Sequence, residues 1–186
     1  MHLENMYYSI DINEDKTYTL QSSDNAYYDN ILNPNNYTRN DYVRVLKIEV
    51  KDKNDKIKII GLVGDIYIFD YNCAVLEENR LIVLMDRNIT VIDLERMAIV
   101  NNKSINSTGC NLAIFKIDYG YVIYGEVEII KLDELLNEEW VFSGKDIFVT
   151  KDGDIPFTIE NNKIKLHDWN NTYYELDMNG NLICVN

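Results

Sequence analysis

The sequence predicts an all-β fold built from repeated four-stranded antiparallel meanders. Two observations carry this prediction. Short apolar runs alternate with tight polar breaks along most of the chain, and a strand that ends in aspartate returns at intervals of about 40 residues. Residues 81–100 show the pattern in one stretch, because an apolar run at 81–85 is followed by a turn cluster and then by alternation at the period of a pleated strand.

The N-terminal part of the chain is expected to hold a hairpin and a long loop. Residues 7–12 and 17–20 flank a polar break, which predicts a hairpin over 7–20. Residues 21–41 are polar and turn-rich, with isolated apolar side chains. A loop of this length is uncommon inside a compact domain, so either a short helix lies at 27–32 or the segment is a functional loop.

Four repeats are expected after this loop, at about 43–71, 73–100, 112–143 and 147–177. The first pairs 42–50 with 57–63 and adds a strand at 66–71. The strands expected in the other three repeats are 73–76, 81–85, 89–93 and 97–100, then 112–117, 121–124, 127–133 and 140–143, then 147–150, 156–159, 163–168 and 173–177. Between 132 and 140 the apolar residues fall at roughly helical spacing, which predicts one or two helical turns there.

An aspartate closes one strand in each repeat. These residues are Asp52, Asp93, Asp133 and Asp168, at successive spacings of 41, 40 and 35 residues. An aspartate that follows a strand commonly accepts hydrogen bonds from the backbone of the next turn, so we expect a structural role for all four.

A period near 40 with four short strands is typical of blade repeats, in which each small sheet buries its faces against its neighbours. The segments TVIDLE and IIKLDE resemble the third strand and following turn of WD-type β-propeller blades, over roughly residues 43–180. The resemblance implies a β-propeller-like interaction scaffold of about four blades, closed or open. The Gly-His pair and the Trp-Asp dipeptide of that family are absent from the expected positions. A β-sandwich or barrel is the alternative.

Composition narrows the class of protein. The 186 residues are expected to form a single β domain, and their net charge of −13, from 31 acidic and 18 basic residues, repels phosphate backbones. Nucleic acid is therefore a poor partner, and a basic protein surface is a better one. The N-terminus lacks the pattern of a signal peptide, and no apolar run approaches the ~20 residues of a membrane helix. We expect a cytoplasmic protein with no membrane partner.

The sequence offers no catalytic, cofactor-binding or metal-binding set. Its three cysteines, Cys73, Cys110 and Cys184, are odd in number, have no CxxC spacing and lie far from either histidine, so free thiols and no zinc site are expected. His2 and His167 leave at most one usable base for nucleophilic catalysis. Asp-Gly-Asp at 152–154 and the segment 177–181 resemble pieces of calcium loops, but both lack the closing glutamate and are interpreted as hairpin turns.

Recognition is therefore assigned to acidic turns and nearby aromatic residues. The candidate partner-binding residues are Glu77, Glu78, Asp133, Glu134, Glu138, Glu139, Tyr119, Tyr121 and Trp140. Glu95 accompanies the first pair, and the two acidic sets are expected near one another on one rim. The predicted function is a non-catalytic module that binds a basic protein, for which the bacterial immunity proteins that neutralise basic toxins are an analogy in size and charge. The alternative is a carbohydrate-active enzyme or a sugar-binding protein on a propeller-like scaffold, which as an enzyme would need two carboxylates facing each other across a cleft.

Overall fold

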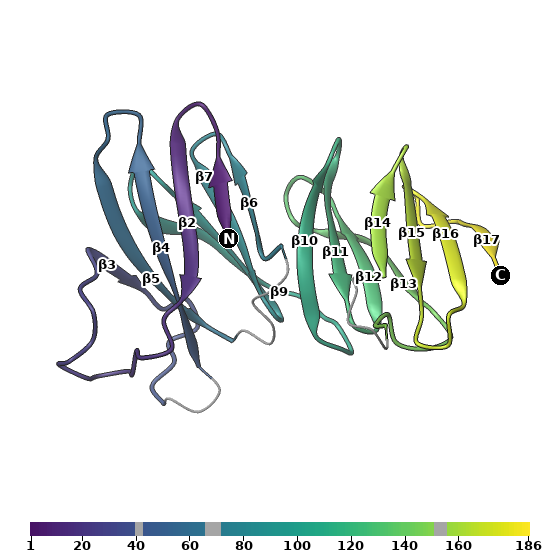
Figure 1. Cartoon of the computed structure of the whole chain (residues 1–186), viewed down its shortest axis with the longest axis horizontal. Coiled ribbons are helices and arrows are strands. Elements are labelled where there is room, and N and C mark those ends of the chain that lie inside the picture. Colours follow the sequence, from purple (N-terminus) through teal and green to yellow (C-terminus); the bar gives the residue numbers. More distant parts are fainter. Residues whose placement is uncertain (40–42, 66–71, 151–155) are drawn as a thin grey trace. The chain divides into compact units, whose positions relative to one another are not determined.

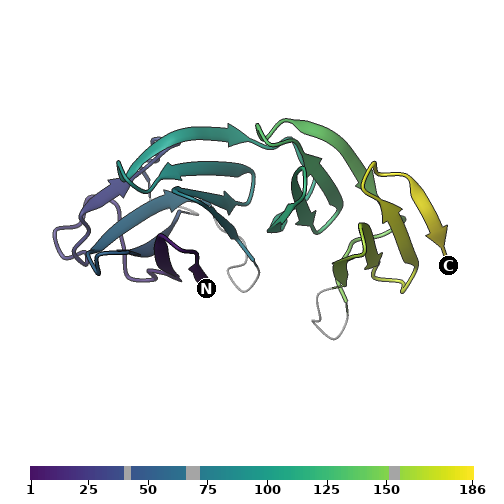
Figure 2. The ribbon, with the colours of Figure 1, turned by 90° about the horizontal axis from the view of Figure 1, so that it is seen from above.

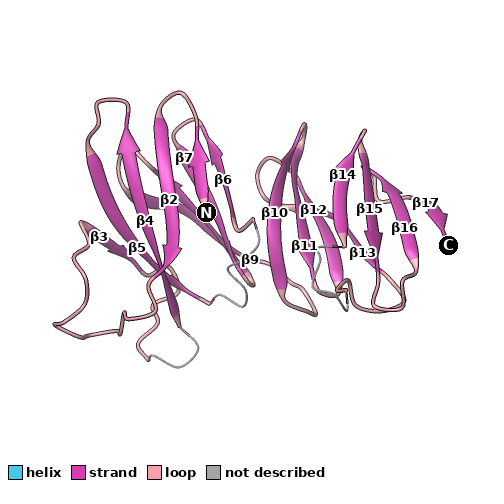
Figure 3. Ribbon diagram, viewed as in Figure 1, coloured by secondary structure: helices cyan, strands magenta, loops and turns pink. Residues whose placement is uncertain are grey.

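The computed structural model describes residues 1–39, 43–65, 72–150 and 156–186. Within those ranges every regular element is a β-strand, arranged in four sheets (Figure 3). The predicted all-β class and its repeated meanders are confirmed. The chain divides into two compact units, Met1–Ile105 and Asn106–Asn186, each of which contains two sheets (Figure 1). The strand expected at 66–71 lies outside the described residues.

Sheet A is the first sheet of unit one. Its strands, in spatial order, are β1 (His2–Glu4), β2 (Tyr8–Glu14), β4 (Arg44–Asp52), β5 (Ile57–Gly64) and β3 (Asn30–Leu32). All neighbours are antiparallel except β3, which runs parallel to β5. Along β2 the burial alternates, so that Ile10 and Ile12 are buried while Asp11 and Asn13 are exposed, which is the pattern of a sheet with one face in the core.

The predicted hairpin over 7–20 is wrong. β2 pairs with β1 and β4, and residues 17–20 form no strand. The cause lies at Asp15, whose N–H donates to the Val45 carbonyl while its carboxylate accepts hydrogen bonds from the Thr17 backbone and hydroxyl and from the Tyr28 hydroxyl. These bonds turn the chain away from β2 and leave its edge free for β4.

Of the two alternatives for 27–32, the short helix does not form, because the segment contributes β3. Asp29 attaches it to sheet A: its N–H donates to the Ile59 carbonyl at 2.9 Å, and its carboxylate accepts the Ile59 N–H at 2.7 Å. The neighbouring Tyr28 ring covers Gly61 on β5, where an added Cβ would lie 3.1 Å from the ring. The backbone hydrogen bonds that a helix would have supplied are thus made to β5 instead.

Sheet B completes unit one as a four-stranded meander. Its strands are β6 (Ala74–Glu77), β7 (Arg80–Met85), β8 (Asn88–Asp93) and β9 (Ala98–Ser104), in that order. Sheets A and B share one apolar core, in which Ile10, Ile48 and Leu62 pack with Leu81 and Ile92, all at most 1% exposed. From Leu81 to Met85 every side chain is buried, which accounts for the unbroken apolar run in the sequence.

Unit two contains two further four-stranded meanders. Sheet C consists of β10 (Asn111–Ile117), β11 (Gly120–Gly125), β12 (Glu128–Leu132) and β13 (Glu138–Ser143), and sheet D of β14 (Phe157–Glu160), β15 (Lys163–His167), β16 (Tyr173–Asp177) and β17 (Leu182–Val185). The two sheets pack through aromatic rings, because Phe157 of sheet D stacks on Tyr124 and Phe115 of sheet C at centroid distances of 5.2 Å. β13 lies beside sheet D (Figure 2). Its Phe142 ring meets the Tyr174 ring edge to face.

The fourth repeat was predicted one strand too early. Residues 147–150 form no strand, and the sheet begins at β14 and ends with β17, which the sequence prediction missed. The misassigned segment carries Phe148, whose ring is fully buried, whose N–H donates to the Glu126 carbonyl and whose own carbonyl accepts the Tyr124 hydroxyl. Within this segment Phe148 fills the core between the two sheets, where its ring contacts Phe142 of sheet C and Tyr174 of sheet D.

The helical turns predicted between 132 and 140 do not form. Asp133–Asn137 is a tight turn between β12 and β13, with the Leu136 N–H donating to the Asp133 carbonyl and the Asp133 N–H donating to the Asn137 carbonyl. Leu136 adopts the left-handed conformation at φ 63° and is buried, so the apolar residue serves the core from within a turn. Leu136 follows Leu132 by four residues, which is the spacing that had predicted a helix.

Candidate functional site

Aspartate-closed turns fix the backbone on which the candidate residues stand. In the turns that begin at Asp52, Asp133, Asp168 and Asp177, the carboxylate accepts the backbone N–H groups two and four residues later, at 2.7–3.0 Å. The residue three positions later has a φ between 61° and 80° in each of them. This is a type I turn followed by a left-handed residue, a common three-residue hairpin loop. These hydrogen bonds confirm the structural role predicted for Asp52, Asp133 and Asp168, and Asp93 likewise accepts the Glu95 and Arg96 N–H groups.

The structure corrects which aspartate marks the fourth repeat. A shift in strand register lies just before Asp93, Asp133 and Asp177, between the third and fourth strands of sheets B, C and D. Asp168 instead closes the turn between the second and third strands of sheet D and is 0% exposed. The equivalent of Asp133 is therefore Asp177, 44 residues later. The sequence prediction chose Asp168 because it had placed the repeat one strand too early.

One group of candidate residues gathers at the end of sheet C. Gly120 and Asp133 are neighbours, since a Cβ on Gly120, which has a φ of 96°, would lie 2.0 Å from the Leu132 carbonyl oxygen and 2.9 Å from the Asp133 backbone. This contact places the turn carrying Tyr119 beside the turn carrying Glu134 and Leu135. Tyr119 is 78% exposed and Leu135 is 75% exposed. We call Tyr119, Glu134, Leu135 and Glu138 the turn surface.

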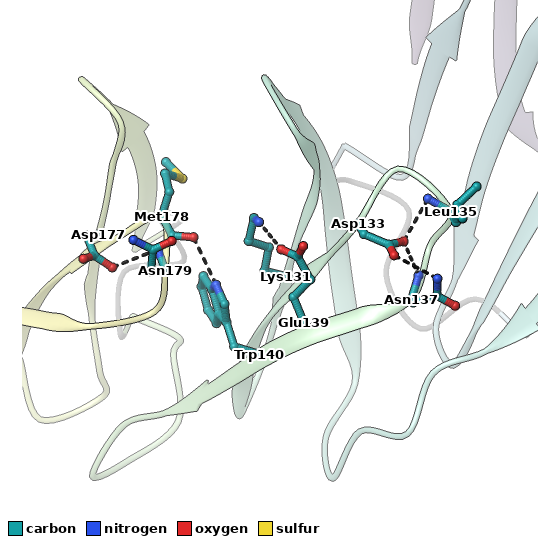
Figure 4. Close-up of polar contacts among 9 residues, drawn as sticks. All are labelled: Lys131, Asp133, Leu135, Asn137, Glu139, Trp140, Asp177, Met178 and Asn179. Carbon is teal, nitrogen blue, oxygen red and sulfur yellow. Dashed lines mark hydrogen bonds and ion pairs between the residues drawn. The ribbon is translucent and has the colours of Figure 1, made fainter.

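The remaining candidates of sheet C are held by specific contacts (Figure 4). Glu139 forms an ion pair with Lys131 across the β12–β13 pair. Trp140 donates its indole N–H to the Met178 carbonyl at 3.1 Å, and its ring covers Gly180 in the turn that begins at Asp177. Trp140 thus joins sheet C to sheet D, and its position in the sequence gave no indication of this role.

Tyr121 belongs to the core of sheet C. It is 1% exposed, and the Lys116 ammonium lies 4.5 Å from the centre of its ring. A residue so deeply buried presents no surface to a partner, so Tyr121 is left out of the turn surface. Its place in the predicted strand 121–124 was equally compatible with a core position.

The acidic pair Glu77 and Glu78 lies in unit one, at the turn between β6 and β7. Glu77 forms an ion pair with Arg80 at 2.9 Å. Glu78 is exposed, has a φ of 46°, and its carbonyl accepts the Asn5 side-chain amide at 2.9 Å. The two predicted acidic sets thus belong to different units of the chain, one to sheet B and the other to sheet C.

A pocket of about 620 Å³ opens between sheets A and B near Glu78. Its lining residues are Tyr7, Tyr8, Val50, Asp52, Lys53, Asn54, Lys56, Lys58, Glu78, Asn79, Leu94, Glu95 and Met97. Sequence reasoning had paired Glu95 with Glu78 but missed the lysines and tyrosines. The run KDKNDKIK at 51–58 carried the missing signal, because a hairpin turn projects its lysines together.

The electrostatics of this pocket are set by its carboxylates. Burial, followed by the negative charges of Glu95, Asp93 and Asp52, raises the pKa of the Tyr8 phenol, which is therefore a neutral hydrogen-bonding group at pH 7. Hydrogen bonds from the Asn54 and Lys56 backbones lower the pKa of Asp52. Asp52 is thus an ionised part of the turn.

Other chemistry finds little support in the described part of the chain. His2 contacts Asp11 at the exposed edge of sheet A, and His167 packs against Tyr173 on the exposed side of sheet D. Among the residues that the structure describes, no three His, Cys, Asp or Glu side chains lie close enough together to hold a metal ion. The three cysteines are free thiols, and burial raises the pKa of Cys73 to about 11. The described residues contain no helix of the length and hydropathy that crossing a membrane requires.

Comparison with known proteins gives a likeness of fold. No protein-family model and no curated protein matches the chain. Among solved structures, BamB from Moraxella catarrhalis is similar at 16% identity and a TM-score of 0.48, over 77% of this chain and 46% of that one. The AfRom2 CNH domain is similar at 12% identity and 0.48, over 78% and 47%, and Kluyvelomyces marxianus Hsv2 at 10% identity and 0.43, over 76% and 46%.

These neighbours are β-propeller-like proteins, and this chain spans less than half the length of each. Their TM-scores lie below 0.5, so the propeller-like architecture rests on the strand pairing within the chain itself: stacked meanders with a bulge and an aspartate turn at equivalent places. No sheet closes into a barrel among the described strands.

Proposed function

We propose that this protein is a non-catalytic binding module that takes a basic protein partner on the turn surface of sheet C. The observation that carries the proposal is the exposure of an aromatic and an aliphatic side chain, Tyr119 and Leu135, on adjoining turns, with the exposed Glu134 and Glu138 close in sequence to Leu135. Exposed apolar groups rimmed by charge are typical of recognition sites. Neutralising a basic toxin, as immunity proteins do, is one form that such binding could take.

The charges of the turn surface are available to a partner. Glu134 and Glu138 are exposed, and neither forms an ion pair within 4.0 Å in the described part of the chain. Glu139 differs, because Lys131 already neutralises it. An unpaired carboxylate attracts an approaching cation, whereas a paired one presents little net field. The protein's net charge of −13 adds long-range attraction of the same sign.

The turn surface is also rigid at its base. Asp133 accepts the Leu135 and Asn137 N–H groups at 2.8 and 2.7 Å, and its second oxygen accepts the Asn137 side chain at 2.8 Å. A turn fixed by three hydrogen bonds loses little conformational entropy on binding, which favours affinity. These contacts support recognition by a preformed surface.

The proposal is tested by binding kinetics at two salt concentrations. A partner is first captured from lysate at low ionic strength with the wild-type protein. Association is then measured for Glu134→Lys/Glu138→Lys, with Lys131→Gln/Glu139→Gln as the control that removes a whole ion pair and leaves the net charge unchanged. The reversal should slow association at least tenfold at low salt, and the control should change it less than twofold, since steering follows the net field of the surface.

Two controls separate the surface from general charge effects. Asp24→Lys changes an exposed carboxylate of unit one, and Tyr119→Ala/Leu135→Ala removes the apolar contacts while leaving the charge intact. The double alanine variant should speed dissociation with little effect on association. If Asp24→Lys slows association as much as the reversal does, or if binding ignores salt and every substitution, this assignment fails.

A further inference from the structure

The pocket of unit one has opposite charges on its two walls. The turn between β4 and β5 and the start of β5 contribute Lys53, Lys56 and Lys58, all from sheet A. Sheet B contributes Glu78 from the turn between β6 and β7 and Glu95 from the turn between β8 and β9. Asp52, at the end of β4, lies on the same wall as the lysines. Sheet A therefore presents three lysines and one carboxylate and keeps a net positive charge, whereas sheet B presents two carboxylates.

These opposite charges do not neutralise each other. In the described part of the chain none of the five forms an ion pair within 4.0 Å, although several surface pairs elsewhere do, such as Lys51 with Asp55 at 2.6 Å. The turns that carry them are fixed, because Asp52 accepts the Asn54 and Lys56 N–H groups and Asp93 accepts the Glu95 and Arg96 N–H groups. The separation of charge is therefore built into the backbone.

The interior of the pocket combines apolar and aromatic groups. Val50 and Leu94 are each 1% exposed and belong to the shared core, so they offer a ligand almost no surface. The accessible apolar lining comes from Tyr7 and from the half-buried Tyr8 and Met97. Tyr7 is 43% exposed at the entrance, where an aromatic face can receive a cation or an apolar stem. The volume lies in the range of pockets that hold a ligand larger than one amino acid.

We propose that this pocket binds a polypeptide segment that carries a basic and an acidic side chain close together. The basic group lies against Glu78 and Glu95, the acidic group lies against the lysines, and the apolar stems lie against Tyr7 and Met97. Each group thus meets a wall whose net charge is opposite to its own. A segment of one sign would satisfy one wall and be repelled by the other. This site is independent of the turn surface, which belongs to unit two.

The test uses three capped peptides that differ only in charge: acetyl-Arg-Gly-Glu-amide, acetyl-Arg-Gly-Gln-amide and acetyl-Gln-Gly-Glu-amide. They are titrated into the full chain at low salt and followed by amide chemical shifts. The doubly charged peptide should shift the amides of 53–58 and 94–97 and bind about tenfold more tightly than either singly charged peptide, which is the effect of one added charge-assisted contact.

Variants assign each charge to its wall. Glu78→Gln/Glu95→Gln should make the Arg-Gly-Glu and Gln-Gly-Glu peptides bind equally, and Lys53→Gln/Lys56→Gln/Lys58→Gln should do the same for Arg-Gly-Glu and Arg-Gly-Gln. Lys16→Gln, an exposed lysine beyond the far end of β2, should change nothing. The amide chemical-shift changes measured with the wild-type protein locate the binding site even if a variant fails to fold.

Three results would overturn the proposal. The first is that no peptide shifts the pocket amides at millimolar concentration. The second is that all three peptides bind the wild-type protein equally. The third is that free arginine binds as tightly as the doubly charged peptide, which would make this a site for a small zwitterion rather than for a polypeptide.

Discussion

Replacing Asp168 should destabilise unit two far more than replacing Asp177, although both close the same kind of turn. Each carboxylate accepts the backbone N–H groups two and four residues later. Asp168 is 0% exposed and also accepts the Tyr174 hydroxyl at 2.7 Å, whereas Asp177 lies at an exposed turn. The pair therefore compares one turn geometry in two surroundings.

The magnitude follows from the groups left without a partner. In Asp168→Ala the Tyr174 hydroxyl, on a residue that is 3% exposed, loses its acceptor, which costs about 1–3 kcal/mol. The two turn amides lie nearer to solvent, and losing their acceptor adds about 1 kcal/mol. The expected total is about 3 kcal/mol, which lowers a urea midpoint by about 2 M at an m-value of about 1.5 kcal/mol/M. Asp177→Ala should lower the midpoint by less than half as much.

Urea unfolding followed by tryptophan fluorescence measures this effect. Both tryptophans, Trp140 and Trp169, belong to unit two, so their emission reports on the unit that holds Asp168. Tyr174→Phe supplies a double-mutant cycle: the combined Asp168→Ala/Tyr174→Phe variant should lose about 1 kcal/mol less than the sum of the single changes, because the unpaired hydroxyl is gone. Equal midpoints for Asp168→Ala and Asp177→Ala, or a strictly additive cycle, would refute the reasoning.

Three further predictions concern acid, thiols and a glycine. Burial alone would raise the pKa of Asp168, but hydrogen bonds from Tyr174 and the turn amides outweigh burial and lower the pKa. The stability that ionised Asp168 contributes is therefore present above the unfolded pKa of about 3.9 and is lost as the pH falls through the folded pKa. Melting temperatures between pH 7 and 2 should show the loss, and a flat profile would contradict it. A thiol reagent at pH 8 should modify Cys73 more slowly than the other two cysteines, because burial raises its pKa to about 11. All three thiols should react after denaturation, and fast modification of native Cys73 would be inconsistent with its burial. Gly180→Ala should destabilise unit two and shift tryptophan emission, because Gly180 has a φ of 80° and an added Cβ would lie 2.8 Å from the Trp140 ring. Unchanged emission and stability would show that the ring does not cover the turn.

Much of the fold was predictable because its signals are local. The apolar run from Leu81 to Met85 and the polar breaks around it identified β7 and its neighbours almost to the residue. The turn role of Asp133 was likewise predictable, since a carboxylate and the amides it binds are only four residues apart. Such features depend on hydrogen bonds and alternation within one strand and turn, which the order of residues contains.

The errors arose where a local pattern had two solutions. Apolar residues at 147–150 suit a strand or a core-filling link, and only the position of Phe148 between sheets C and D decided for the link. Residues 17–20 suit the second strand of a hairpin, but the Asp15 contacts and the competing strand β4 prevented it. Pairing across distant segments gains hydrogen bonds that no short window of sequence reveals.

By itself the sequence determined the all-β class, the period near 40 and the structural role of the turn aspartates, because alternation and turn chemistry act over a few residues. Tertiary structure decided the candidate sites. It buried Tyr121, paired Glu139 with Lys131, left Tyr119 and Leu135 exposed on adjoining turns, and gathered the charges of two sheets around one pocket. Exposure and proximity depend on how sheets stack, and stacking joins residues that lie far apart along the chain.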